Sequence, residues 1–509
     1  MNIEAKDLIV GRCDKAMFYA FCGLIYFFPI SISLLEWGFS IAFLAYLVKR
    51  ATIFRFELGQ APVGVAPRNR FTLFLKSFKP LSSHVNIPIA LYVFIAFLSV
   101  IFSQCVPLSI KGFVFKLLES VFLCFLMVEC MTSKKRIQIF ITIFLISVTV
   151  ITVNGIYQYI VGVGFVRNHL LHLNRVDSTF KHANDFGAYL IMVILFLLNY
   201  SFAMALSSEK RKRLKSILIR AALCGLLITS VICLGLTLSR GAWSGFFIGL
   251  AFMAFFGKRP LVTVLILFSS FILIFTPLLN QFRNVSFISD DISGDKKFYE
   301  DLLTKKRSAP ASNPPAAIIE EKPQDKISTS PAILEPLTID SSKSEEPLVN
   351  KIIDKLSDAT IPLTKHNFNI ANFFTGRIGG MGRTGFWSAA LEIIKKNPLI
   401  GTGLNTYSKV EVKHGYPHNC YLQMAAEIGI IGLLAFLFIL WRIFYNGFGT
   451  LKKIADPYYQ NILMGLLAGF LGFLVHSFVD TNFYSVQLGS LMWVWMGFII
   501  AIQKLGLEG

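Results

Sequence analysis

The chain has 509 residues, of which 54% are hydrophobic, 14% aromatic and 16% charged, and its formal net charge is +19. A soluble protein would carry about 25% charged residues, and here apolar runs of roughly 18 or more residues recur along the chain. This composition excludes an ordinary soluble protein and indicates one that crosses a membrane many times.

Apolar segments long enough to cross a bilayer occur throughout the sequence. We expect the first to remain as a membrane helix rather than a removed signal peptide, because it lacks a small-residue cleavage site. The sequence predicts an all-α membrane protein with about twelve transmembrane helices, at residues 17–33, 35–49, 87–104, 112–131, 138–157, 185–206, 217–238, 241–257, 261–279, 428–446, 461–480 and 485–503.

Lys and Arg cluster in every second connection between these spans, for example at 134–136, at 210–213 and at 452–453. The positive-inside rule places these connections, and with them both termini, in the cytoplasm. A basic patch for nucleic acid is the rival explanation of the net charge. Charge distributed over alternate loops favours membrane orientation, so we expect the lipid bilayer, and no nucleic acid, as a partner.

Three parts follow from this layout: membrane helices 1–9 (residues 1–279), a large extracytoplasmic loop (280–427) and membrane helices 10–12 (428–509). The loop is almost balanced in charge, with 18 basic and 17 acidic residues. Within it, residues 305–347 are rich in Pro, Ser, Lys and Glu and are predicted to be a flexible insert. Residues 384–396 predict a short amphipathic helix, ended by Asn397-Pro398.

Metal or disulfide chemistry has little support in the sequence. The eight cysteines show no CxxC or Cys/His metal spacing, which argues against a disulfide scaffold or a zinc site. His169 and His172 can ligate a metal, but solvated side chains are the simpler interpretation. Asp177 and Asp185 can hold a divalent ion or cap turns, and we favour turns. No metal or cofactor is predicted.

Two arginines stand out on the predicted outer side. Arg240 lies in TLSRGAWSGFF between two apolar spans, where a charge costs about 2.5–3.5 kcal/mol and usually has a partner or a function. Arginine snorkelling to the interface is the alternative. Arg383 precedes the amphipathic helix, and a guanidinium beside free N–H groups at a helix start forms an anion site suited to phosphate. Arg377 is a second candidate, and a plain surface arginine is the alternative.

Further polar residues lie at the starts of outer segments. The loop before residue 185 supplies Arg175 and Asn184, and the stretch GYPHNCYLQMAAEIG (415–429) supplies His418 and Asn419. Histidine is the side chain best matched to proton transfer near neutral pH, although an interfacial structural histidine is the commoner case. Glu427 can orient this histidine or cap the following helix.

His476 and Asp480, one turn apart, are interpreted as a structural polar pair outside the site. Taken together, the arginines and His418 predict a diphosphate site with a proton acceptor, which combines electrostatic and general-base catalysis.

These motifs resemble those of the O-antigen ligase and O-antigen polymerase family of bacterial envelope glycosyltransferases. The similar stretches are RVDSTFKHANDFGAYL (175–190), TLSRGAWSG (237–245) and, between Gly382 and Gly432, Arg383, Trp387, PLIGTG (398–403), His418-Asn419, Tyr421, Glu427 and Gly429. The resemblance covers most of the chain from about residue 140. The Pro/Ser-rich insert is longer than the family leads us to expect.

The resemblance implies a GT-C-like all-helical enzyme in the bacterial inner membrane, with its active site on the outer face. It implies transfer of a glycan from undecaprenyl diphosphate to a hydroxyl acceptor such as lipid A-core, without a nucleotide sugar or metal. Arg175, Arg240 and Arg383 would bind the diphosphate, and His418 would assist the acceptor, with Asn184, Asn419 and Glu427 in supporting positions.

Two alternatives to a ligase remain. A polymerase would use the same donor with another carrier-linked repeat as acceptor, and the shared motif does not separate the two. A secondary transporter is the remote alternative; it predicts substrate groups near the midplane, for which Lys116 and Glu119 are the best support. These two residues can equally be a structural intramembrane pair.

Overall fold

The computed structural model describes residues 2–60, 72–74, 77, 83–171, 174–206, 213–257, 383–411 and 415–508. The predicted ninth span (261–279), the predicted insert (305–347) and Arg377 lie outside these residues.

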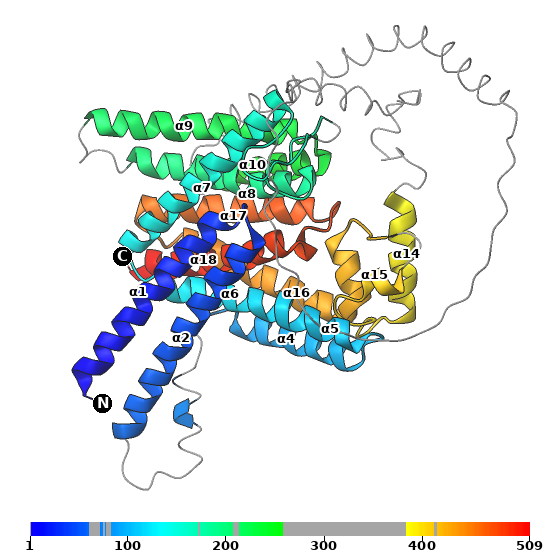
Figure 1. Cartoon of the computed structure of the whole chain (residues 1–509), viewed down its shortest axis with the longest axis horizontal. Helices are drawn as coiled ribbons and strands as arrows, with labels where there is room; N and C mark the ends of the chain where they lie inside the picture. The colour runs from blue at the N-terminus through cyan, green and yellow to red at the C-terminus, as the bar shows by residue number, and fades with distance from the viewer. Residues whose placement is uncertain are drawn as a thin grey trace, which may run out of the picture. The chain divides into compact units, whose positions relative to one another are not determined.

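The described residues are organised as helices (Figure 1). The predicted all-α class is confirmed for them, since their extended pairing is limited to an isolated bridge between Val163 and Leu170. In chain order the helices are α1 (Ile3–Phe27), α2 (Ile32–Gln60), α4 (Asn86–Ile101), α5 (Val106–Gly112), the π-helix η1 (Phe113–Leu118), α6 (Glu119–Cys130), α7 (Lys134–Val161), α8 (Ala183–Leu206), α9 (Arg213–Leu236), α10 (Arg240–Phe256), α14 (Arg383–Lys396), α15 (Tyr407–Val410), α16 (Cys420–Leu451), α17 (Pro457–His476), the 3-10 helix η3 (Asn482–Tyr484) and α18 (Val486–Glu508).

Seven described helices are long and apolar enough to cross a membrane, namely α2, α7, α8, α9, α16, α17 and α18. Two further apolar helices are shorter, α4 with 16 residues and α10 with 17. The predicted span 112–131 is divided among α5, η1 and α6. A protein that crosses the membrane several times is therefore supported, and the number twelve stays a prediction.

Several predicted boundaries are corrected by the structure. The first helix begins at Ile3 rather than 17 and ends before Pro29, because proline cannot donate to a continuing helix. The helix α2 continues to Gln60, beyond the predicted end at 49. The helix α16 begins at Cys420, so residues 420–427, which precede the predicted span, are helical. The predicted spans follow the apolar runs, which match the thickness of the membrane, whereas the helices that contain these runs continue past it.

The core lies around α8, α17 and α18. The most apolar windows of α8 and α18 are 89% and 94% buried inside the protein, whereas that of α2 is 11% buried. Helix α8 packs against α17 and α9, and α17 packs also against α10 and α18. Many outward side chains of α2 are large and apolar, for example Trp37 and Leu44, as expected for a surface that faces lipid.

Helix α16 is broken at Gly429, whose φ of 77° lies in the left-handed region. The loop after α14 crosses this break: the amide of Ile430 donates to the carbonyl of Pro398 at 2.8 Å, and that of Thr402 to Ala426 at 3.0 Å. A side chain at Gly429 would collide with the carbonyl of Leu399. The glycine of the break and the PLIGTG segment thus form one unit in which backbone groups freed at the break are satisfied, as a membrane interior requires.

The two ends of the helix bundle carry different structural features. Both chain termini lie at the end remote from α14 and α15 (Figure 1). At the terminal end, Lys49 bonds Asp14 and Glu129 at 2.7 and 2.6 Å, and Arg50 bonds Glu129 at 2.8 Å. This ionic cluster joins α1, α2 and α6. The other end carries α14, α15 and the start of α16, where the sequence predicts the site.

Candidate active site

The start of α16 is bonded to the segment that follows α17. The amide of Cys420 donates to the carbonyl of Ser477 at 2.9 Å, and its Sγ contacts the carbonyl of Asp480 at 3.1 Å. The Tyr421 hydroxyl donates to the carbonyl of Leu474 at 3.0 Å. These bonds hold the loop before α16 against the loop after α17.

His418 lies in the loop before α16, and its side chain is 47% exposed. Its φ of 46° is in the left-handed region, which is uncommon for residues other than glycine and recurs at functional sites. The next residue, Asn419, accepts bonds from the amides of Tyr421 and Leu422, both at 3.0 Å. Asn419, predicted as a supporting residue, is therefore the N-cap that fixes the backbone next to His418.

Asp480 faces His418, with 3.6 Å between its Oδ1 and the histidine Nδ1. The carboxyl is buried, and its Oδ2 has no hydrogen-bond partner in the described part of the chain. Burial would raise the pKa of Asp480, but the imidazole of His418 and the charge of His476 hold it at about 2. Asp480 is therefore an anion at neutral pH, positioned to orient His418 through Nδ1.

The predicted pairing of Asp480 with His476 is not the main contact of either residue. The ring of His476 is engaged by the Ser239 hydroxyl at 3.5 Å and by the Asn482 side chain at 3.0 Å. The spacing of four residues predicts only a pair with His476 and gives no indication of the contact between Asp480 and His418. The signal that identifies Asp480 is a carboxylate at the end of an apolar span, where an unpaired charge is expensive.

Arg175 is held between α8 and the end of α9. Its Nε donates to the carbonyl of Thr237 at 2.8 Å, and its terminal nitrogen donates to Oδ1 of Asn184 at 2.5 Å. Burial lowers the pKa of Arg175, the charge of Asp480 raises it, and the charge of Arg240 lowers it. Asn184 thus orients the guanidinium, as its predicted supporting position implies, and Arg175, Arg240 and Asp480 share one electrostatic environment.

Arg240 is the first residue of α10, and its side chain is half-buried. The turn before it packs on the end of α17: a side chain at Gly241 would collide with Val479 and with the ring of His476. The glycine that follows Arg240 in the SRG motif therefore lets the α9–α10 turn approach the segment that carries Asp480.

Arg383 is the first residue of α14, and its side chain lies outside the described part of the structure. The predicted amphipathic helix is confirmed, with the same end at Lys396. In its first turn, the ring of Phe386 meets the ring of His418 edge-on, with 5.9 Å between the centroids. The helix that begins with Arg383 is thereby packed against the histidine.

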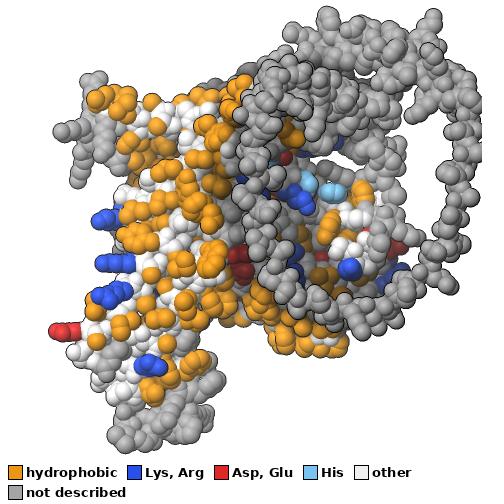
Figure 2. Space-filling view, viewed as in Figure 1, with side chains coloured by type: hydrophobic (Ala, Val, Ile, Leu, Met, Phe, Trp, Pro, Cys, Tyr) orange, Lys and Arg blue, Asp and Glu red, His pale blue; other side chains and the backbone are white. Residues whose placement is uncertain are grey.

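His182 also belongs to this region, although no role was predicted for it. Partial burial, then the charge of Lys181, lowers the pKa of His182, and the charges of Asp480 and His418 also act on it. Histidine and basic side chains gather on this face beside α14 (Figure 2). Segments far apart in sequence, around residues 175, 240, 383, 418 and 480, thus meet at one end of the bundle.

Glu427 has a different position from the one predicted. Its carboxylate accepts from the amides of Asn405 at 2.7 Å and Tyr407 at 3.3 Å, and from Gln423 Nε2 at 3.1 Å. It therefore holds the loop before α15 and caps that short helix, rather than orienting His418 or capping α16. The backbone break at Gly429 directs the turn of α16 that carries Glu427 toward the loop before α15. The spacing of residues in the sequence does not reveal this direction.

Lys116, the best support for a transporter, donates to Oδ1 of Asn405 at 2.8 Å. Its ammonium also lies in the field of Glu427. Its partners are therefore in the loop that Glu427 organises rather than at Glu119, and the residue has a structural explanation.

The other polar residues of the outer loop form turns. Asp177 accepts from Gln158 Nε2 at 2.7 Å, and its Oδ1 lies 3.8 Å from His169 Nδ1. His172 lies outside the described residues. In the described ranges, no three His, Cys, Asp or Glu side chains form a group that could hold a metal ion.

The comparison with known protein families finds one match. The family model described as O-antigen ligase matches residues 224–437, a region that contains Arg240, Arg383 and His418. No curated protein matches the chain. Arg175 and Asp480 lie outside the matched region in sequence, and the folding of the chain brings them to the candidate site. The match over residues 224–437 confirms the predicted resemblance to the O-antigen ligase and O-antigen polymerase family.

Proposed function

We propose that the protein is an O-antigen ligase-type glycosyltransferase. It transfers a glycan from undecaprenyl diphosphate to a hydroxyl group of lipid A-core or a similar acceptor. The observation that carries the proposal is the contact between His418 and a buried carboxylate at 3.6 Å, beside Arg175 and Arg240. A histidine with an anionic partner is a competent general base, and arginines are suited to a diphosphate.

The reaction is a displacement at the anomeric carbon of the donor sugar. The acceptor oxygen forms a bond to this carbon, and the bond from the carbon to the diphosphate oxygen breaks. The electron pair leaves with undecaprenyl diphosphate, and the hydroxyl proton passes to Nε2 of His418, since Nδ1 faces Asp480. General-base catalysis of this type contributes about 10²–10⁴-fold.

The arginines stabilise the charge that develops on the leaving diphosphate. Arg175 is oriented before substrate arrives, because Asn184 and the Thr237 carbonyl hold two edges of its guanidinium. Preorganised donors of this kind need no rearrangement during the reaction. We assign Arg240 and Arg383 to the same diphosphate, so that transfer requires no metal ion or cofactor.

The site would face the outside of the bacterial inner membrane. The distribution of Lys and Arg predicts that both termini are cytoplasmic, and the termini lie at the end of the bundle remote from α14 (Figure 1). Donor and acceptor lipids would reach the site from the outer leaflet.

The proposal is tested by mixing the purified full chain with undecaprenyl diphosphate-linked glycan and lipid A-core. We expect attachment of the glycan to the core, unchanged by a chelator. Loss of activity that only divalent ions restore would contradict the assignment of charge stabilisation to arginines. Replacement of Arg175 or Arg240 by Lys should weaken donor use, because lysine keeps the charge and loses the planar donor fork.

A deletion strain separates ligase from polymerase. A ligase defect leaves long carrier-linked chains that are not attached to the acceptor. A polymerase defect leaves products with a single repeat, and that outcome would reassign the acceptor to a second carrier-linked glycan while keeping the same donor chemistry.

A further inference from the structure

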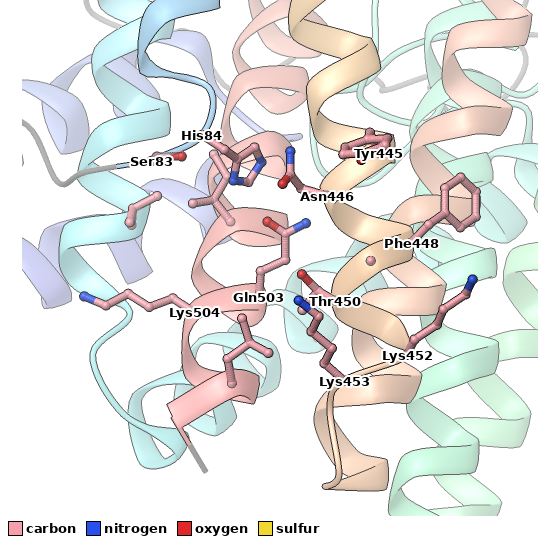
Figure 3. Close-up of a pocket in the computed structure, with 14 residues that line it drawn as sticks. Ser83, His84, Tyr445, Asn446, Phe448, Thr450, Lys452, Lys453, Gln503 and Lys504 are labelled. Atoms are coloured by element: carbon pink, nitrogen blue, oxygen red, sulfur yellow. The ribbon is translucent and has the colours of Figure 1, made fainter.

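A cavity of about 620 Å³ lies at the C-terminal end of α16, whereas His418 precedes its N-terminal end. Its walls come from the ends of α16 and α18, from Val128 of α6 and from Ser83 and His84 before α4 (Figure 3). The 32 residues of α16 separate this cavity from the candidate active site, a path of about 48 Å at 1.5 Å per residue. The cavity is therefore separate from the candidate active site.

Positive charge dominates the lining of this cavity. Lys452, Lys453 and Lys504 line it, and no acidic residue is among the described residues that do. The side chain of Lys453 extends into the cavity beside Thr450, while Lys452 and Lys504 extend to either side (Figure 3). A concave surface with one sign of charge concentrates counter-ions of the opposite sign.

Unpartnered polar groups are buried in the same wall. Gln503 is 4% exposed, and among the residues that the structure describes neither its Oε1 nor its Nε2 has a hydrogen-bond partner; Nε2 of His84 has none among them either. His84, Asn446 and Gln503 point toward the same space between the helices (Figure 3). Buried polar groups in native proteins are nearly always paired, so these groups indicate a polar molecule that belongs in the cavity.

His84 enters the cavity as a neutral ring. Burial, and then the charge of Arg442, lower the pKa of His84 to about 4; the Nε of Arg442 donates to the His84 carbonyl at 3.2 Å. A neutral imidazole offers one donor and one acceptor. Together with the amide of Gln503 it can bind phosphate oxygens, and the lysines supply the charge.

Lysines near helix C-termini also have a purely structural explanation, because they offset the negative end of the helix dipole. That explanation accounts for the positions of Lys452 and Lys504. It leaves the unpartnered amide of Gln503 and the volume of the cavity unexplained.

The apolar part of the lining identifies the kind of ligand. Val128, Phe448, Ile500 and Leu507 lie beside the lysines, and Leu507 is 54% exposed. A soluble anion would gain nothing from these side chains, whereas an amphiphile contacts them with its chains and the lysines with its head. Basic pockets between membrane helices on the cytoplasmic side are suited to anionic lipid headgroups.

We propose that the cavity between the C-terminal ends of α16 and α18 binds the phosphate headgroup of an anionic phospholipid. Lys453 and Gln503 contact the phosphate, and Lys452 and Lys504 hold it from either side. The lipid joins α16 to α18 at the end of the bundle remote from the candidate active site. This binding is independent of the transferase reaction.

The test uses the purified full chain in nanodiscs or detergent, with phosphatidylglycerol as the anionic probe and phosphatidylcholine as the neutral one. Lipid retention is measured by native mass spectrometry, and stability by thermal unfolding. We expect phosphatidylglycerol to be retained and to raise Tm more than phosphatidylcholine. Equal effects of both lipids would overturn the proposal. A rise in Tm with inorganic pyrophosphate in the absence of anionic lipid would assign the cavity to a soluble ligand instead.

Lysine variants locate the binding. The triple variant Lys452→Gln, Lys453→Gln and Lys504→Gln should lower the affinity for phosphatidylglycerol about 100-fold, since each basic residue near an anionic lipid is worth about fivefold. The matched control removes three exposed charges outside the cavity, with Arg12→Gln, Lys15→Gln and Lys135→Gln. An equal loss in both triple variants would show that general charge, rather than the cavity, binds the lipid.

The variant Gln503→Met separates binding from folding. It keeps the volume and removes an amide that is unpartnered without ligand, so the protein in phosphatidylcholine should be at least as stable as wild type. The rise in Tm from phosphatidylcholine to phosphatidylglycerol should be smaller for this variant than for wild type. An undiminished gain would contradict the assignment of the phosphate to this amide.

Discussion

Two regions of the protein contain a buried carboxylate near the start of α16, and they differ in how the carboxylate is paired. Glu427 accepts from two backbone amides and a glutamine side chain, and it holds the loop before α15. Asp480 accepts from the amide of Thr481 at 2.8 Å and faces a histidine that is half exposed, and its Oδ2 has no partner among the described residues.

The difference shows which carboxylate is available for chemistry. A carboxylate whose oxygens are occupied by backbone donors is part of the architecture, because any change in it costs those bonds. A charged carboxylate that contacts a partly exposed histidine can act on proton transfer at that histidine while its own position stays the same. Sequence position left Glu427 either to orient His418 or to cap the following helix, and the contacts favour Asp480 as the partner of His418.

The strongest test of this comparison is the removal of the imidazole. We expect His418→Ala to lower the transfer rate about 10²–10⁴-fold, the usual contribution of a general base, with normal membrane insertion. Because residue 418 has a φ of 46°, His418→Asn is the matched variant, since asparagine tolerates this conformation. Rates are measured with lipid-linked donor and core acceptor. Near-normal transfer by the asparagine variant would remove the proton-transfer role and leave only a backbone effect.

The second test concerns the charge that faces the histidine. We expect Asp480→Asn to lower the turnover rate about 10²-fold, with a smaller change in KM, because Asp480 acts on the reaction through His418. The double variant with His418→Asn should then be no slower than His418→Asn alone. An additional loss in the double variant would indicate a structural role for Asp480.

The third test concerns the other carboxylate. Glu427→Gln should lower the free energy of unfolding by about 2–3 kcal/mol, because an amide cannot accept from all three donors. The transfer rate per folded molecule should change less than threefold. Glu392→Gln, on the exposed surface of α14, is the control for loss of one negative charge. A large loss of rate without loss of stability would return Glu427 to the catalytic site.

The smallest expected effect is the pH dependence of stability that Asp480 contributes. Its pKa in the folded protein, about 2, is below the unfolded value. The contribution is therefore present above about pH 4 and is lost as the pH falls toward 2, and it amounts to at most about 2 kcal/mol. Unfolding of wild type and Asp480→Asn is compared at pH 5 and pH 2.5. Identical acid dependence in the two proteins would show that this carboxyl is not held in its charged form.

Local patterns were sufficient to predict the membrane class and the individual motifs. Apolar runs predicted helices at most of the observed positions, since a run of this length can be satisfied only as a helix in a bilayer. The amphipathic pattern of 384–396 predicted α14, and the SRG and PHN stretches drew attention to Arg240 and His418. Helix ends were less predictable, as α1 and α16 show, because helices continue into polar sequence.

The sequence by itself determined which side chains are available for chemistry and on which segments they lie. Only the tertiary structure decided their pairing: Asp480 with His418, Arg175 with Asn184, and Glu427 with the backbone of Asn405 and Tyr407. The reason is physical. Pairing depends on the break at Gly429 and on the bonds between α16 and the end of α17, which join residues about 60 positions apart. Hydrophobic periodicity carries no information about contacts at that separation.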